Sequence, residues 1–275
     1  MGLINPSRGV VDFEGFRALK PLYEAAMAAG IWVVVRPGPV NMIPYINAET
    51  TAGGIAHWVT AEVAGRLRTN DSDWTEAWRD YILGIIEETV PYQINAGGPV
   101  IGMSAIQLDN EYTQDYPGHG EYYEELKKVF HDSKIVVPLT YNDPNQGGNF
   151  INGTGAVDLY GMDSYPQRFD CSHPSAWRPV VTNYHEYHER VNPSQPWYIP
   201  EFQAGSYDAW GPGAPGYAPC AELTGPAFQS VFNLQLWASN AKLINYYMLV
   251  VCSLNKIALT SRKGKSQAPT RSPHD

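Results

Sequence analysis

A regular alternation of two kinds of segment constrains the fold of this 275-residue chain most strongly. Stretches with apolar residues at helical spacing alternate with short, continuous apolar runs. The pattern predicts helices at 13–30, 73–94, 120–133, 175–191 and 225–241, and strands at 31–35, 100–111, 135–141, 157–165, 197–201 and 243–249. Strands that helices cover on both faces have such unbroken apolar runs, so the alternation predicts a parallel α/β fold.

Polar and charged side chains gather where the predicted strands end. Arg36 follows the first strand, and Glu111, Tyr165 and Glu201 close three later strands. In a (β/α) barrel the catalytic side chains occupy the carboxyl ends of the strands. The sequence also lacks the Gly-rich nucleotide or phosphate loop of doubly wound sheets. These two observations favour a barrel.

The composition narrows the classes of partner. A net charge of -9, with 18 Tyr and 8 Trp, argues against nucleic acid or an anionic membrane surface and suits a neutral, ring-shaped ligand better. The sequence contains no run of about 18 apolar residues, so it predicts no membrane span. The first residues lack the features of a signal peptide. Two short sequons, at Asn70 and Asn152, are candidate glycosylation sites and only weak signs of secretion.

The three cysteines, Cys171, Cys220 and Cys252, lack metal-ligand spacing. Ordinary buried thiols are the default interpretation for such residues. The scattered histidines have no matching acidic partner motif either. We therefore expect neither a metal nor another cofactor.

The two glutamates at strand ends are candidates for paired acid and nucleophile chemistry. Glycoside hydrolysis needs one carboxylic acid to protonate the leaving oxygen and a second carboxylate to attack the anomeric carbon or activate water. Asn110 directly precedes Glu111, and its amide would hydrogen-bond the sugar 2-hydroxyl. The alternative, solvated carboxylates at strand termini, describes most Asp and Glu. The residues alone leave the two interpretations evenly weighted.

Two other segments have a structural explanation that the residues alone favour. Asn47, Ala48 and Glu49 would form an ordinary polar loop, or alternatively would contact sugar hydroxyls. Tyr165 is a half-buried strand tyrosine, or a residue that stacks on or hydrogen-bonds a sugar.

Taken together, several segments resemble the catalytic barrel of fungal β-galactosidases of glycoside hydrolase family 35. They are Arg36-Pro37-Gly38-Pro39, Tyr45-Ile46-Asn47-Ala48-Glu49, Gln107-Leu108-Asp109-Asn110-Glu111-Tyr112, Tyr160-Gly161-Met162-Asp163-Ser164-Tyr165-Pro166 and Pro200-Glu201-Phe202-Gln203-Ala204-Gly205. The resemblance covers roughly residues 3–249 and implies a (β/α)8 TIM barrel.

The resemblance also implies an activity and roles for residues. It implies a secreted, monomeric, cofactor-free enzyme that removes terminal non-reducing β-D-galactose from oligo- or polysaccharides with retention. Glu111 would be the acid/base and Glu201 the nucleophile. The implied substrate contacts are Tyr45, Asn47, Ala48, Glu49, Asn110 and Tyr165. Cys171 and Cys220 would pair as a disulfide, which displaces the buried-thiol interpretation for these two.

The chain departs from the family pattern in three places. Residues 40–44 interrupt a motif that is continuous in the family. The first two barrel strands and the end of the eighth are missing from the matching region, and 250–275 is an unrelated, basic stretch that we expect to be disordered. We therefore expect a partial barrel over 1–249, an incomplete or mis-spliced gene product, and little or no activity of this chain.

Two alternatives to a β-galactosidase stay open. One is a retaining β-glycosidase with another sugar specificity. The other is a catalytically inactive galactoside-binding protein, which would bind galactose without turnover.

Overall fold

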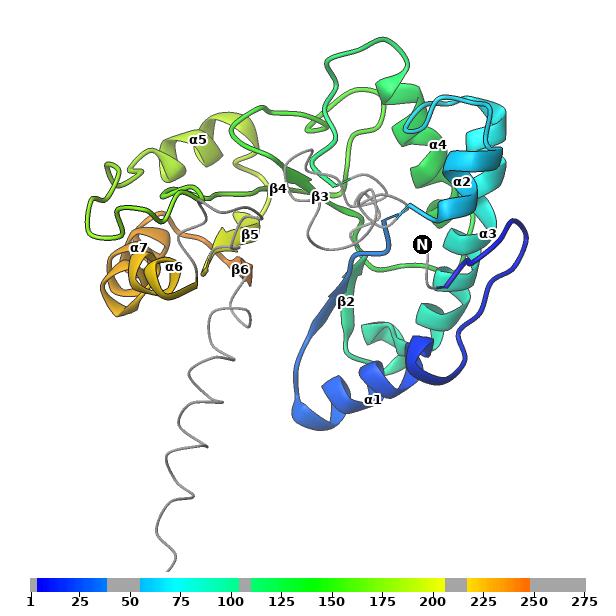
Figure 1. The fold of residues 1–275 in the computed structure, drawn as a ribbon, viewed down its shortest axis with the longest axis horizontal. Coiled ribbons are helices and arrows are strands. Elements are labelled where there is room, and N and C mark those ends of the chain that lie inside the picture. The colour runs from blue at the N-terminus through cyan, green and yellow to red at the C-terminus, as the bar shows by residue number, and fades with distance from the viewer. Residues whose placement is uncertain (1–3, 39–54, 104–109, 206–216, 248–275) are drawn as a thin grey trace, which may run out of the picture. The chain divides into compact units, whose positions relative to one another are not determined.

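The computed structural model describes residues 4–38, 55–103, 110–205 and 217–247 (Figure 1). The predicted disordered stretch at 250–275 and the interruption at 40–44 lie outside these residues. Two compact units make up the chain. Unit 1 comprises residues 1–163 and 188–198, and unit 2 comprises 164–187 and 199–275.

Helices and strands alternate along most of the described chain, as the apolar periodicity predicts. The strands are β1 (Val33–Val35), β2 (Val100–Met103), β3 (Thr140–Asp143), β4 (Leu159–Met162), β5 (Tyr198–Gln203) and β6 (Leu243–Tyr247). The α-helices are α1 (Lys20–Ala29), α2 (His57–Glu62), α3 (Ser72–Thr89), α4 (His119–His131), α5 (Tyr184–Val191), α6 (Tyr217–Leu223) and α7 (Pro226–Ala238). Three 3-10 turns are η1 (Gly15–Arg17), η3 (Val90–Tyr92) and η4 (Ile94–Ala96).

Strands that follow one another along the chain lie next to one another, and the pairings β1–β2, β3–β4 and β4–β5 are parallel. In unit 1, β1 pairs with β2, β3 pairs with β4, and the first residue of β5 pairs with β4. A parallel bridge between Met103 and Leu139 joins the end of β2 to the start of β3. In unit 2, β5 continues beside β6, where the Ala204 amide donates to the Tyr247 carbonyl at 3.0 Å. The described residues thus hold six strands, two fewer than a closed TIM barrel.

Helix α3 shows how the sequence periodicity becomes packing in unit 1. Its large apolar side chains recur three or four residues apart and are almost fully buried, as Trp74, Trp78 and Ile82 illustrate. Helix α1 is capped at its carboxyl end by Gly30, whose φ of +67° is the left-handed conformation that glycine adopts readily.

Several predicted elements are shorter than their apolar patterns suggest. The helix predicted at 13–30 is the 3-10 turn η1 followed by α1, which begins only at Lys20, and the strand predicted at 157–165 spans only Leu159–Met162. The strand predicted at 135–141 begins only at Thr140, because Gln93 Oε1 accepts the Val136 amide at 2.7 Å and Pro138 has no amide to donate. The helix predicted at 175–191 begins only at Tyr184, and Pro179 lies within the missing part. Helices α2 and α6 are additional to those predicted.

Unit 2 has its own core, which contains the disulfide that the family resemblance implies. Cys171 and Cys220 form this bond across a sequence separation of 49 residues, and Leu223 packs against them. Beside them Phe228 lies 4.5 Å from Phe232 between ring centroids, and both rings pack near Phe202 of β5. The bond therefore ties the segment after β4 to the helices that follow β5.

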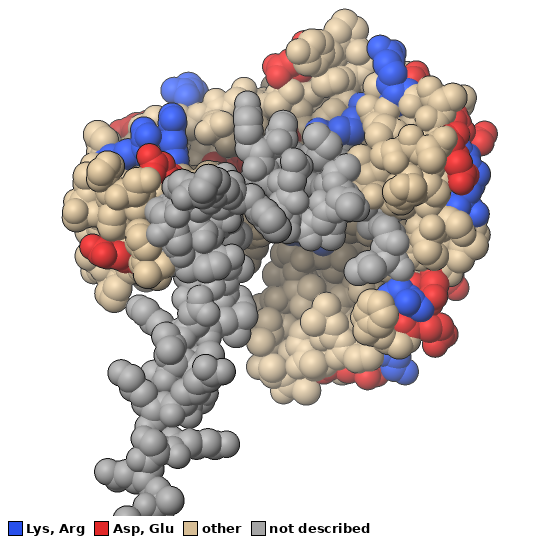
Figure 2. All heavy atoms as spheres, in the orientation of Figure 1, with Lys and Arg blue, Asp and Glu red and all other residues tan. Residues whose placement is uncertain are grey.

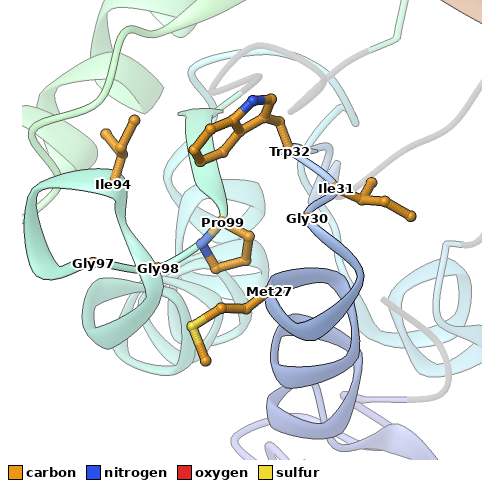
Figure 3. Close-up of a pocket in the computed structure, with 8 residues that line it drawn as sticks. All are labelled: Met27, Gly30, Ile31, Trp32, Ile94, Gly97, Gly98 and Pro99. Carbon is orange, nitrogen blue, oxygen red and sulfur yellow. The ribbon is translucent and has the colours of Figure 1, made fainter.

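An apolar pocket of about 280 Å³ lies at the amino ends of β1 and β2 (Figure 3). It is lined by Met27, Gly30, Ile31, Trp32, Ile94, Gly97, Gly98 and Pro99. No lining residue can be charged, and catalytic groups of barrel enzymes lie at the opposite ends of the strands. This pocket is therefore separate from the candidate catalytic residues.

Acidic and basic side chains are interspersed on the face that Figure 2 shows. Among the described residues, Arg8 pairs with Asp73 at 3.1 Å and Lys128 with Asp132 at 2.8 Å. None of the helices in the described ranges is long and apolar enough to cross a membrane.

We predict that loss of the disulfide destabilises the protein. The double variant Cys171→Ala/Cys220→Ala should lose about 2–4 kcal/mol of unfolding free energy, because the bond restricts the unfolded chain. Urea unfolding followed by tryptophan fluorescence measures this loss. Cys252→Ala, which keeps the Cys171–Cys220 bond, is the matched control; an equal midpoint for both variants would contradict the prediction.

Candidate active site

Asn110 lies where the ends of three strands of unit 1 meet. Its side chain is almost fully buried, with 3% exposed. Asn142 of β3 donates from Nδ2 to Asn110 Oδ1 at 2.8 Å, and Arg36, directly after β1, donates from Nη2 to the same oxygen at 3.3 Å. Asn110 itself follows β2. These contacts fix the direction of its amide.

The same hydrogen-bonded row extends to the fourth strand. Asn142 Nδ2 also donates to Oδ2 of Asp163 at 2.6 Å, and Asp163 follows β4 directly. Both side chains are buried. A row of polar side chains, Arg36, Asn110, Asn142 and Asp163, thus crosses the carboxyl ends of β1 to β4. Barrel folds place their catalytic groups at this end of the strands.

Glu111 follows this row in a backbone conformation that few side chains adopt. Its φ is +52°, in the left-handed region, which costs a non-Gly residue roughly 1–2 kcal/mol. The surrounding contacts must offset that cost, and strain of this kind clusters at functional sites. Glu111 is half-buried, and the fixed backbone conformation at this residue restricts the directions that its carboxyl can take.

Tyr112 anchors the chain on the other side of Glu111. Only 4% of its surface is exposed, and its ring lies 4.3 Å from that of His119 between centroids. Tyr123 and Phe150 stack on the same cluster. The Tyr141 hydroxyl donates to the Tyr112 carbonyl at 2.5 Å, so the turn is fixed on both sides of the glutamate.

Asp143 organises the loop after β3. Its carboxylate accepts the amides of Asn145 at 3.2 Å and Asn149 at 2.9 Å, and the Tyr160 hydroxyl at 3.0 Å. Burial raises the pKa of Asp143, because desolvation outweighs these hydrogen bonds. The Gln114 amide donates to Asn149 Oδ1 at 2.9 Å, so this loop also holds the segment after Glu111.

Glu201 lies within β5, in unit 2, and is 3% exposed. The Tyr165 hydroxyl donates a short hydrogen bond to Glu201 Oε2. Backbone pairing brings these two residues together, because the Ser164 amide donates to the Glu201 carbonyl at 2.8 Å. The Tyr247 ring stands edge-on to Tyr165, with 6.3 Å between centroids. The hydroxyl donor holds Oε2 of this buried carboxylate in one direction.

The sequence-predicted site residues fall into four groups. Asn110 and Glu111 lie at the polar row, and Tyr165 contacts Glu201. The candidate sequon residues Asn70 and Asn152 are exposed. The remaining candidates, Tyr45, Asn47, Ala48 and Glu49, lie outside the described residues.

Sequence reasoning gave no role to Arg36, Arg68, Asn142 or Asp163. Arg36 and Asp163 stand inside the motifs quoted for the family resemblance, and Asn142 directly follows a predicted strand, so a signal for these three existed. Arg68 lies in a loop with no such signal, yet its Nη2 donates to the Asn110 carbonyl at 3.2 Å.

We predict that Asn142→Ala destabilises the protein by about 2–3 kcal/mol, because it removes two buried hydrogen bonds, one of them to a carboxylate. Asn145→Ala makes the same change at an exposed side chain three residues further on and should cost less than about 0.5 kcal/mol. Urea unfolding of both variants measures the difference. Equal unfolding midpoints would show that Asn142 does not support the row.

Comparison with known proteins gives the family that the sequence motifs resemble. The sequence model described as "Glycosyl hydrolases family 35" matches residues 2–250. A "Beta-galactosidase" from Aspergillus niger is 37% identical over 255 residues, and a "Probable beta-galactosidase A" from Neosartorya fischeri is 40% identical over 255. Each alignment covers 90% of this chain and 24% of the relative, so the chain spans about a quarter of the length of these proteins.

Solved structures of other glycosidases share the fold. A family 5 glycoside hydrolase variant from Streptomyces cattleya, solved with Manβ1-4GlcNAc, has a TM-score of 0.56 at 12% identity, covering 99% of this chain and 72% of that one. The GH1 β-glucosidase from Exiguobacterium antarcticum B7 has a TM-score of 0.50 at 13% identity, covering 89% and 71%. The fold is that of the TIM-barrel glycosidases, and the chain belongs to glycosyl hydrolases family 35.

Proposed function

We propose that this chain is the catalytic portion of a retaining β-galactosidase, with Glu201 as nucleophile and Glu111 as acid/base. The substrate class is a β-galactoside oligo- or polysaccharide, from which terminal non-reducing galactose is released. One observation carries this proposal: in a family 35 chain, Glu201 is buried within β5 and its carboxylate accepts a hydrogen bond from a tyrosine hydroxyl.

Glu201 would attack the anomeric carbon of the galactoside. In that step a bond forms between a carboxylate oxygen and C1, and the bond from C1 to the leaving oxygen breaks. The hydrogen bond from Tyr165 holds one oxygen of the carboxylate, which leaves the other in a defined direction. Water then hydrolyses the galactosyl ester.

Glu111 would protonate the leaving oxygen in the first step and take a proton from the attacking water in the second. Asn110, whose Oδ1 accepts from Asn142 and Arg36, directs its amide for a contact with the sugar 2-hydroxyl. The mechanism requires no metal or other cofactor.

Further contacts follow from the family resemblance. We assign hydroxyl contacts to Asn47, Ala48 and Glu49, and part of the pocket wall to Tyr45. We also propose a secreted, monomeric protein with glycans at Asn70 and Asn152, whose exposed side chains are accessible to modification. The catalytic region would end at 249, before a separate stretch at 250–275.

A catalytically inactive galactoside-binding protein is the second candidate. The interruption at 40–44 favours it, because these residues stand next to the sugar-contacting segment in the family pattern. For the same reason we expect steady-state turnover well below that of an uninterrupted family member. The decisive experiment therefore detects one covalent reaction per chain rather than repeated turnover.

We predict covalent labelling of Glu201 by 2,4-dinitrophenyl 2-deoxy-2-fluoro-β-galactoside. The fluorine slows hydrolysis of the glycosyl–enzyme bond, and the activated leaving group needs no acid. Intact-mass spectrometry should find one fluorogalactosyl group per chain, and peptide mapping should place it on Glu201. Glu111→Gln should still be labelled, because only the proton donor is lost.

Two controls separate the competing functions. Glu201→Gln should remain unlabelled, and the corresponding fluoroglucoside should label at least about tenfold more slowly, since a site that hydrogen-bonds one hydroxyl discriminates strongly against its epimer. Equal labelling by both sugars would point to another specificity. Galactose binding without any label would contradict the proposal and support the inactive binding protein.

A further inference from the structure

We propose that Arg68 is a positioning residue that sets the direction of the Glu111 carboxyl. This inference rests on the proposed function, in which Glu111 is the proton donor. Arg68 lies in the loop before α3, more than 40 residues from Glu111 in sequence. It contacts the residues on both sides of that glutamate.

The guanidinium of Arg68 joins the two neighbours of Glu111. Its Nη2 donates to the Asn110 carbonyl at 3.2 Å. Its Cζ lies 4.9 Å from the centre of the Tyr112 ring, within the range of a cation–π contact. A single planar group therefore spans the turn from Asn110 to Tyr112.

The contact is reciprocal. The Tyr112 hydroxyl donates to the carbonyl of Arg68 at 2.6 Å, so each residue holds the other. The loop around Arg68 is itself fixed, because the Thr69 hydroxyl donates to the Arg66 carbonyl at 2.7 Å and the Arg66 amide donates to Asp71 at 2.7 Å. Asp71 directly precedes α3, which anchors the loop in the core.

The Asn110 carbonyl is the atom through which Arg68 acts on Glu111. That oxygen lies in the rigid plane of the peptide that joins the two residues, so holding it fixes the plane and with it φ of Glu111. Asn142 and Arg36 donate to the Asn110 side chain, and rotation about the torsions of that side chain separates these contacts from the peptide plane. Since the left-handed φ of Glu111 is intrinsically unfavourable, loss of Arg68 should let this peptide relax.

A relaxed peptide would move the Glu111 carboxyl out of hydrogen-bond reach of the leaving oxygen. The effect depends on the substrate, because a poor leaving group needs the proton and an activated one does not. This dependence separates a positioning role of Arg68 from a general loss of folded protein.

The experiment compares Arg68→Met, Arg68→Lys and the control Arg66→Met, whose parent side chain is exposed and pairs with Asp71. Single-turnover galactosylation is measured with phenyl and with 2,4-dinitrophenyl β-galactoside. Arg68→Met should slow the phenyl substrate roughly tenfold or more and the dinitrophenyl substrate less than about twofold. Arg68→Lys should recover part of the loss, and Arg66→Met should behave as the parent.

Hydrogen exchange at the amides of residues 111 and 112 provides a readout that needs no activity. It should be faster in Arg68→Met than in Arg66→Met at equal melting temperature. Equal slowing on both substrates, or unchanged exchange at 111 and 112, would overturn the inference. If the parent chain cleaves no galactoside, the proposed function fails, and the exchange result alone supports or overturns the role of Arg68.

Discussion

The hydrogen bond from Asn142 to Asn110 is the interaction on which the candidate acid site depends. It joins two buried amides at the ends of neighbouring strands, and the same Asn142 nitrogen reaches the Asp163 carboxylate. Each of these groups was desolvated on folding, so each needs its partner. The row therefore couples the register of the strands to the position of the chain at Asn110, where Glu111 follows.

Packing and strain have complementary roles around this row. The buried tryptophans of α3 and the aromatic cluster at Tyr112 supply the apolar contacts that hold the scaffold. The same contacts offset the unfavourable backbone of Glu111. In unit 2, Glu201 lies within the regular strand β5, and the Tyr165 hydroxyl donates to its carboxylate.

The sequence predicts these features unequally. Helix α3 and strand β1 follow from local apolar spacing, and Glu111 and Glu201 follow from their motifs. The late start of β3 depends on Gln93, a side chain more than 40 residues away that takes the place of a strand partner. Arg68 is a similar case, because Asn110 and Tyr112, which it contacts, lie close to it in space but more than 40 residues away in sequence. Periodicity carries no information about such pairs, so a structure was needed to find them.

The central claim is that Glu111 and Glu201 act as a pair in hydrolysis with retention of configuration. The stereochemistry of the released sugar tests this claim most directly. Proton NMR of an aryl β-galactoside with a high concentration of the chain records the first anomer formed, before mutarotation mixes the two. A double displacement through Glu201 predicts that β-galactose appears first. The initial appearance of α-galactose would mean direct attack by water and would contradict the roles assigned to Glu111 and Glu201.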